Sequence, residues 1–139
     1  MPLEINQQLI IKQLNVSPSF DAKTEATQRI EFIKSTLISS RRVNLILGIS
    51  GGIDSSVTGR LAQLAVEQLR AQNYNAQFIA VRLPYGVQLD EEDAQNALRF
   101  IQPDQSLVIN IKQACDELLS DITNNPVAFT SPSHEDFVL

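Results

Sequence analysis

Apolar residues recur along this chain at two spacings, and these predict helices and strands in alternation. Spacings of three and four residues predict amphipathic helices over residues 3–15 and 24–38. The second helix is expected to have a wide apolar face, formed by Ala26, Ile30, Phe32, Ile33 and Leu37. A turn at 17–21 separates the two helices, and the carboxylate of Asp21 is suited to cap the second one.

Three almost continuous apolar runs predict strands at 43–49, 78–83 and 106–110. Continuous apolarity is typical of strands that are covered on both faces, as in a parallel sheet. Helices are expected to follow the strands, at 57–69, 90–101 and 112–120. Strands that alternate with helices run parallel and are joined by right-handed crossovers. The predicted fold class is therefore α/β, a Rossmann-like parallel sheet with helices on both faces.

We interpret the chain as a single domain with helices at 3–40, a βαβαβ core at 43–120 and an irregular tail at 121–139. His134, the only histidine, lies in the tail and is predicted to be a surface residue. In the core, Gly59 is expected to let its helix pack closely on the sheet. The four acids at 90–93 suit the first turn of a helix, with a metal site as the alternative.

Composition excludes several classes of protein. The chain has 139 residues, enough for one domain, and a net charge of −5 that argues against extended nucleic-acid binding. Its apolar runs are far shorter than a membrane span, and the N-terminus lacks the basic and apolar regions of a signal peptide. A single cysteine, Cys115, excludes an intrachain disulfide. We therefore expect a cytoplasmic protein with no nucleic-acid or membrane partner.

The segment from Ser50 to Ser55, with the sequence Ser-Gly-Gly-Ile-Asp-Ser, joins the first predicted strand to a helix. Gly51 and Gly52 allow the backbone to turn sharply and to come close to an anion. The amides of the first helical turn then point at that anion, so the segment predicts a phosphate site. A glycine turn with a simple capping residue is the plainer alternative.

Asp54 indicates that a cation accompanies the phosphate. A carboxylate alone would repel a phosphate, whereas Mg²⁺ prefers oxygen ligands and can lie between the two. The segment is not a Walker loop, because no lysine follows the glycines, and it is not G-x-G-x-x-G. In a parallel sheet ligands bind beyond the carboxyl ends of the strands, so Arg82 at the end of the second strand is expected to face the same crevice.

The glycine segment resembles the pyrophosphate loop of ATP pyrophosphatases, which adenylate a substrate oxygen. Four further stretches, 59–65, 81–88, 90–95 and 100–104, resemble ammonia-dependent NAD synthetase. The resemblance runs from about residue 9 to the C-terminus. It implies an adenine nucleotide alpha hydrolase-like fold and a homodimer that uses ATP and Mg²⁺ to adenylate deamido-NAD. Ammonia would then displace AMP to give NAD.

The resemblance also implies roles for individual residues. Asp54 matches a Mg²⁺ ligand, and we name Asp54 and Ser50 as candidate catalytic residues. The residues expected to bind ATP are Gly48, Ile49, Ser50, Gly51, Gly52, Ile53, Asp54, Ser55, Arg82 and Gln88. The planar guanidinium of Arg82 suits phosphate or ribose oxygens, although a salt bridge to the acids at 90–93 is the alternative.

The chain departs from the family pattern in two places. Thr36 stands where the family usually has an aromatic residue that contacts the dinucleotide. The sequence ends at Leu139, which resembles the end of the amino-terminal half of the enzyme. We therefore expect it to bind ATP without forming NAD. Other readings are a GMP synthetase-like or tRNA-modifying enzyme with the same loop, or a nucleotide-binding module without turnover.

Overall fold

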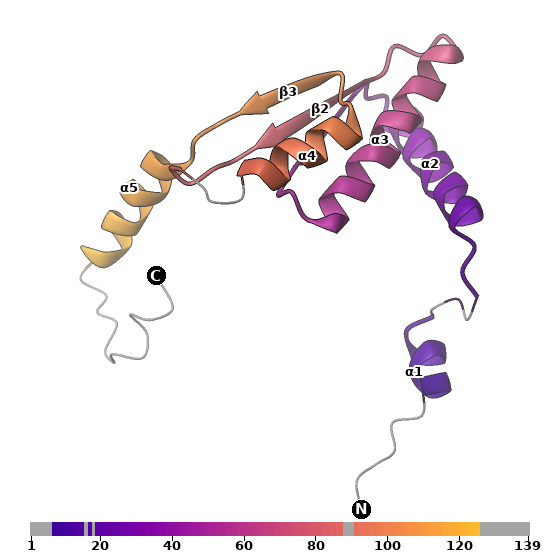
Figure 1. Ribbon diagram of the computed structural model, residues 1–139, viewed down its shortest axis with the longest axis horizontal. Coiled ribbons are helices and arrows are strands. Elements are labelled where there is room, and N and C mark those ends of the chain that lie inside the picture. The colour runs from indigo at the N-terminus through magenta and orange to yellow at the C-terminus, as the bar shows by residue number, and fades with distance from the viewer. Residues whose placement is uncertain (1–6, 16, 18, 88–90, 126–139) are drawn as a thin grey trace, which may run out of the picture.

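The computed structural model describes residues 7–15, 17, 19–87 and 91–125, and their elements follow the predicted order (Figure 1). They are α1 (Gln7–Gln13), α2 (Ala22–Ser39), β1 (Asn44–Gly48), α3 (Ile53–Ala71), β2 (Gln77–Arg82), α4 (Glu91–Ile101), β3 (Gln105–Val108) and α5 (Lys112–Thr123). His134 and most of the predicted tail lie outside the described residues. Within the described ranges, no helix is long and apolar enough to cross a membrane.

The three strands form one parallel sheet in the order β1-β2-β3, which confirms the predicted α/β class. Gly48 at the end of β1 pairs with Val81, and Arg82 at the end of β2 pairs with Val108. The carboxyl ends of all three strands therefore meet at one edge of the sheet. This is the edge at which the glycine loop and Arg82 were expected to come together.

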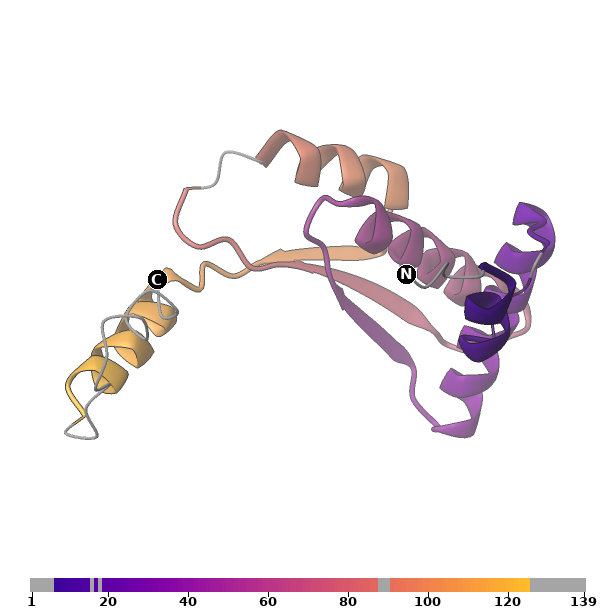
Figure 2. The same cartoon turned by 90° about the horizontal axis from the view of Figure 1, so that it is seen from below.

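Helices α3 and α4 lie on the same face of the sheet (Figure 2). Helix α3 packs against β1 and β2, and α2 and α4 each pack against α3. The side chains between them form the core, with Leu69, Phe78, Val66 and Ile101 fully buried. The opposite face carries Ile46, which is 68% exposed, and Leu107, which is 46% exposed. The helices predicted on this second face are not found among the residues that the structure describes. Among the described residues, helices therefore cover one face of the sheet.

Gly59 was predicted to allow close packing of its helix on the sheet, but in the structure it allows close packing on another helix. A Cβ added to Gly59 would lie 2.7 Å from Cδ1 of Ile101. The missing side chain therefore lets α3 approach α4, rather than the sheet. The prediction for Asp21 is confirmed, because its Oδ1 accepts a hydrogen bond of 2.8 Å from the amide of Thr24 and caps α2.

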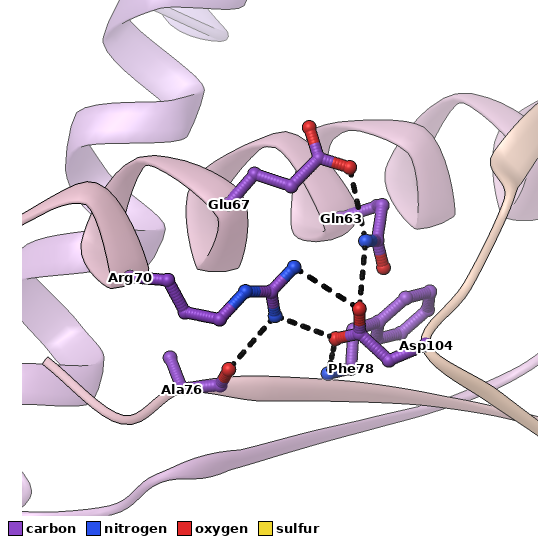
Figure 3. Close-up of polar contacts among 6 residues, drawn as sticks. All are labelled: Gln63, Glu67, Arg70, Ala76, Phe78 and Asp104. Atoms are coloured by element: carbon purple, nitrogen blue, oxygen red, sulfur yellow. Dashed lines mark hydrogen bonds and ion pairs between the residues drawn. The ribbon is translucent and has the colours of Figure 1, made fainter.

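Asp104 joins three elements at the amino end of the sheet, the edge opposite the glycine loop (Figure 3). Its carboxylate accepts two bonds from the guanidinium of Arg70, at 2.8 and 3.1 Å. It also accepts from Nε2 of Gln63 at 3.1 Å and from the amide of Phe78 at 2.9 Å. Partial burial acts to raise the pKa of Asp104, but the donors of Arg70, Phe78 and Gln63 outweigh it and hold this pKa below its ordinary value.

Candidate functional site

The glycine loop turns from β1 into α3 beneath the start of α4. Gly51 has a φ of +92°, and a Cβ on it would lie 3.0 Å from the backbone nitrogen of Ala94. Both the backbone angle and the close approach of α4 require a residue without a side chain. Gly52 is the N-cap residue of α3 and has no side chain of its own to cap the helix. The predicted need for glycine in this loop thus has a direct structural cause at Gly51.

Serine hydroxyls hold the loop in shape. Ser50 Oγ and Ser55 Oγ lie 3.1 Å apart, and Ser50 Oγ accepts a bond of 3.3 Å from the amide of Gly52. The carbonyl of Gly52 accepts from Ser55 Oγ at 3.1 Å and from Ser56 Oγ at 2.8 Å. The role of Ser56 was not predicted, although its place one position after Ser55 would have suggested a local bond of this kind. The loop is therefore held by hydrogen bonds among its own residues.

The start of α3 presents backbone amides at the end of the loop. The amide of Ser56 donates to the carbonyl of Gly52 at 3.1 Å, so the amides of Ile53, Asp54 and Ser55 precede this bond. Amides in the first turn of a helix have no partner within the helix and carry the positive end of its dipole. The described geometry is thus suited to phosphate oxygens, and a phosphate site here stays a prediction.

A cavity of about 290 Å³ opens beside the loop at the carboxyl edge of the sheet. It is lined by Gly48, Ile49, Ser50, Val81, Arg82, Leu83 and Ala94. Four predicted site residues from two strands therefore share one cavity: Gly48, Ile49, Ser50 and Arg82. Gln88, the remaining predicted contact on the second strand's side, lies outside the described residues. Ala94 was not predicted as a site residue, and its small side chain near the start of α4 is the signal that could have suggested a close contact.

Arg82 is almost fully buried, with 4% of its side chain exposed, and it pairs with Glu91 at the start of α4. Its Nη1 lies 2.6 Å from Glu91 Oε1. The same carboxylate oxygen accepts from Nε2 of Gln95 at 2.8 Å. The hydrogen bond from Arg82, followed by that from Gln95, lowers the pKa of Glu91. The alternative stated for Arg82, a salt bridge to the acids at 90–93, is therefore observed, and it leaves Arg82 on the cavity wall.

Asp54 lies exposed in the first turn of α3, at the amide-lined end of the helix. Among the described residues, no group of three or more His, Cys, Asp and Glu side chains could hold a metal ion. A single exposed carboxylate nevertheless fits Mg²⁺, because this ion is usually held by one or two carboxylates, water and the phosphates of a nucleotide. The residues present are thus compatible with a metal that arrives with its nucleotide.

A second polar cluster ties the segment after β2 to the start of α5. The hydroxyl of Tyr85 donates to Asp116 at 2.5 Å, and Nζ of Lys112 lies 2.6 Å from the other oxygen of that carboxylate. Asn110 Oδ1 accepts from the amides of Gly86 and Lys112, at 3.1 and 3.0 Å. Hydrogen bonds from Lys112 and Tyr85 lower the pKa of Asp116. Only the spacing of Lys112 and Asp116 on one helix could have suggested this cluster from the sequence.

Comparison with known proteins identifies relatives for most of the chain. Residues 25–133 match the family model described as NAD synthase. The chain is 52% identical over 132 residues to the NH(3)-dependent NAD(+) synthetase of Burkholderia cenocepacia (strain HI2424), covering 95% of this chain and 47% of that protein. It is 48% identical over 132 residues to the protein of the same name from Paraburkholderia phytofirmans, covering 95% of this chain and 46% of that protein.

Solved structures agree with the sequence comparison. The crystal structure of NAD+ synthetase from Burkholderia pseudomallei matches with a TM-score of 0.85 and 48% identity, over 94% of this chain and 56% of that chain. The NH3-dependent NAD synthetase from Campylobacter jejuni matches with a TM-score of 0.63, over 78% of this chain and 44% of that one. Its identity of 22% supports the fold alone. The chain thus spans about half the length of the curated relatives that it matches.

Proposed function

Because the chain belongs to the NAD synthase family, we propose that it provides the ATP-binding part of an ammonia-dependent NAD synthetase. The family uses ATP, and the cavity that joins the glycine loop to Arg82 is the observation that supports an ATP site here. The match to this family also disfavours the two other enzyme types with the same loop, GMP synthetase and tRNA-modifying adenylases.

In the proposed reaction, the carboxylate of deamido-NAD attacks the α-phosphorus of ATP, and pyrophosphate leaves. Ammonia then attacks the adenylated carboxyl group and displaces AMP, which gives NAD. No protein nucleophile is needed, so catalysis consists of positioning the two anions and stabilising the charge that develops.

The residues of this chain would contribute to the first step. The amides of Gly51 and of the first turn of α3 would bind phosphate oxygens, and Ser50 would hold the loop around them through its bond from the amide of Gly52. Arg82 would neutralise negative charge from the wall of the cavity. Asp54 would hold Mg²⁺ against the phosphates, and a bound Mg²⁺ supplies charge stabilisation on the leaving pyrophosphate. Gln88 stays a predicted ATP contact.

We further propose that the protein acts as a cytoplasmic homodimer. Helix α2 supports this, because Phe32 is 68% exposed and Ile38 is 48% exposed on it. An exposed apolar side chain such as Phe32 suits a two-fold contact in which each copy presents the same residue to the other. The proposed small-molecule partners are ATP, deamido-NAD and ammonia.

The activity is tested with the protein at its full encoded length, incubated with deamido-NAD, MgATP and ammonium. We expect equal amounts of NAD, AMP and pyrophosphate, measured by a coupled dehydrogenase assay and by chromatography. Asp54→Asn should lower the rate by about 10²–10³, because it removes a group that stabilises the transition state. Release of ADP, or binding of ATP with no AMP formed, would contradict the proposed reaction and favour a nucleotide-binding module without turnover.

A further inference from the structure

Glu91 lies at the point where β2, α4 and the cavity meet. It begins α4, and its Oε1 accepts hydrogen bonds from Arg82 Nη1 at 2.6 Å and from Gln95 Nε2 at 2.8 Å. One donor comes from the end of β2 and the other from the next turn of α4. Two donors on one oxygen hold the carboxylate in a single orientation, although half of the side chain is exposed.

Arg82 gains a defined position from this pair. A long arginine side chain has many rotamers, and binding a fixed carboxylate selects one of them before a ligand arrives. The guanidinium has five N–H donors, so one arginine can bind a carboxylate and a phosphate oxygen together. Only 4% of the Arg82 side chain is exposed, and a charge buried to this extent needs an anionic partner. Burial therefore strengthens the hold of Glu91 on the guanidinium.

Helix α4 is itself held against the phosphate loop, which fixes Glu91 relative to that loop. The backbone nitrogen of Ala94 would lie 3.0 Å from a Cβ on Gly51, so the first turn of α4 contacts the loop directly. The Arg82–Glu91 pair then links β2 to the same turn. Loop, strand end and helix thus form one connected unit around the cavity.

We propose that Glu91 is a positioning residue for nucleotide binding, which holds the Arg82 guanidinium on the cavity wall ready for a phosphate oxygen. The inference rests on the proposed function and extends it to a residue that touches no ligand. A carboxylate near a polyphosphate also repels it, so simple charge repulsion predicts the opposite effect of removing Glu91. The two effects can therefore be told apart by the sign of the change in affinity.

The test is a calorimetric titration of MgATP into four variants of the chain. Glu91→Gln keeps an oxygen that can accept from Arg82 but removes the charge. We expect it to weaken MgATP binding about tenfold, which is 1.4 kcal/mol of binding free energy. Glu92→Gln is the matched control, because Glu92 is the next residue of the same turn, is exposed and carries the same charge. It should leave the affinity unchanged or increase it slightly.

The remaining two variants show whether Glu91 acts through Arg82. In the Arg82→Gln background, the further change Glu91→Gln should alter the affinity by less than about twofold, since there is no guanidinium left to position. Equal losses in both backgrounds, or binding by Glu91→Gln as tight as by Glu92→Gln, would overturn the assignment while leaving the ATP site intact. Failure of the unsubstituted chain to bind MgATP would overturn the proposed function and this inference together. Thermal unfolding of each variant checks that it folds. If Glu91→Gln is unfolded, Glu91→Asp replaces it. This variant keeps the charge, so it should lose less MgATP affinity than is expected of Glu91→Gln.

Discussion

At the scale of single residues, two glycines of the candidate site differ in what a methyl group would meet. Gly51 combines a φ of +92° with a Cβ position 3.0 Å from the nitrogen of Ala94, whereas nothing lies within 4 Å of a Cβ on Gly48. We expect Gly51→Ala to lower the free energy of unfolding by about 1–3 kcal/mol, from backbone strain and from the displacement of α4. Gly48→Ala should change it by less than about 0.5 kcal/mol.

Urea denaturation measures the free energy of unfolding of both variants. A Gly51→Ala protein as stable as Gly48→Ala would show that the loop and α4 are not in contact in solution.

Asp104 gives a second prediction at this scale, with a defined dependence on pH. The pKa of its carboxyl is lowered in the folded protein, so its contribution to stability is complete above the ordinary value of 3.8 and is lost as the pH falls through the folded pKa. We expect Asp104→Asn to cost about 1–3 kcal/mol at pH 7, because one charged acceptor serves Arg70, Gln63 and the amide of Phe78.

The difference between the two proteins should shrink as the pH falls below 3.8, because the carboxyl of the unfolded chain takes up a proton there while the folded one stays ionised until its own lower pKa is reached. Denaturant titrations at pH 7 and pH 3 measure it. A difference that is the same at both values would mean that the charge of Asp104 contributes nothing.

At the scale of elements, the packing of α3 on α4 depends on Gly59. Alanine there would place its Cβ 2.7 Å from Cδ1 of the fully buried Ile101. We expect Gly59→Ala to destabilise the protein by about 1–2 kcal/mol, since overpacking outweighs the better helix propensity of alanine. Ile101→Val removes the closest atom of the neighbour, so the double variant should cost less than the sum of the two single changes.

Thermal and denaturant unfolding measure the stability of Gly59→Ala, of Ile101→Val and of the double variant, each relative to the unsubstituted protein. Additive effects would show that Gly59 and Ile101 do not touch.

The elements themselves could be predicted because apolar spacing and turn residues are local. The strands and helices of the described part begin and end within a few residues of their predicted bounds, apart from the start of α3, which begins four residues earlier at Ile53. The start of the first helix, predicted at residue 3, lies outside the described residues. The partner of Gly59 could not be predicted, because the sequence does not say whether a glycine approaches a sheet or a second helix. Nor could it reveal that α3 and α4 share one face of the sheet.

The candidate site could also be predicted only in part, in the position of its residues but not in their contacts. Gly48, Ser50 and Arg82 were placed at one edge by topology alone, and the structure brings them to one cavity. Glu91 was named only as one of four acids, because the ion pair depends on how α4 lies across the loop. The Tyr85–Asp116 contact joins residues 31 positions apart, which no local pattern indicates.

At the scale of the whole molecule, the proposed homodimer can be tested by one substitution that should halve the mass measured in solution. Phe32 on α2 is 68% exposed, and a charge in the centre of a two-fold apolar contact would meet its own copy. Phe32→Glu should therefore convert a dimer into a monomer, as measured by light scattering at tens of micromolar. Lys23→Glu on the same helix, a larger change of charge, should leave the dimer intact. A monomeric wild-type chain, or a dimer that survives Phe32→Glu, would contradict the contact through α2.

The most direct test of the central claim is whether this chain binds ATP in a Mg²⁺-dependent way at the glycine loop. Calorimetric titration of ATP, with Mg²⁺ and with a chelator in its place, is performed on the wild-type chain and on Asp54→Asn. We predict that Mg²⁺ tightens binding to the wild-type chain about tenfold or more, and that Asp54→Asn folds normally but loses most of this gain. Equal Mg²⁺ dependence in both proteins, or no binding of MgATP by the wild-type chain, would contradict the assignment of the loop.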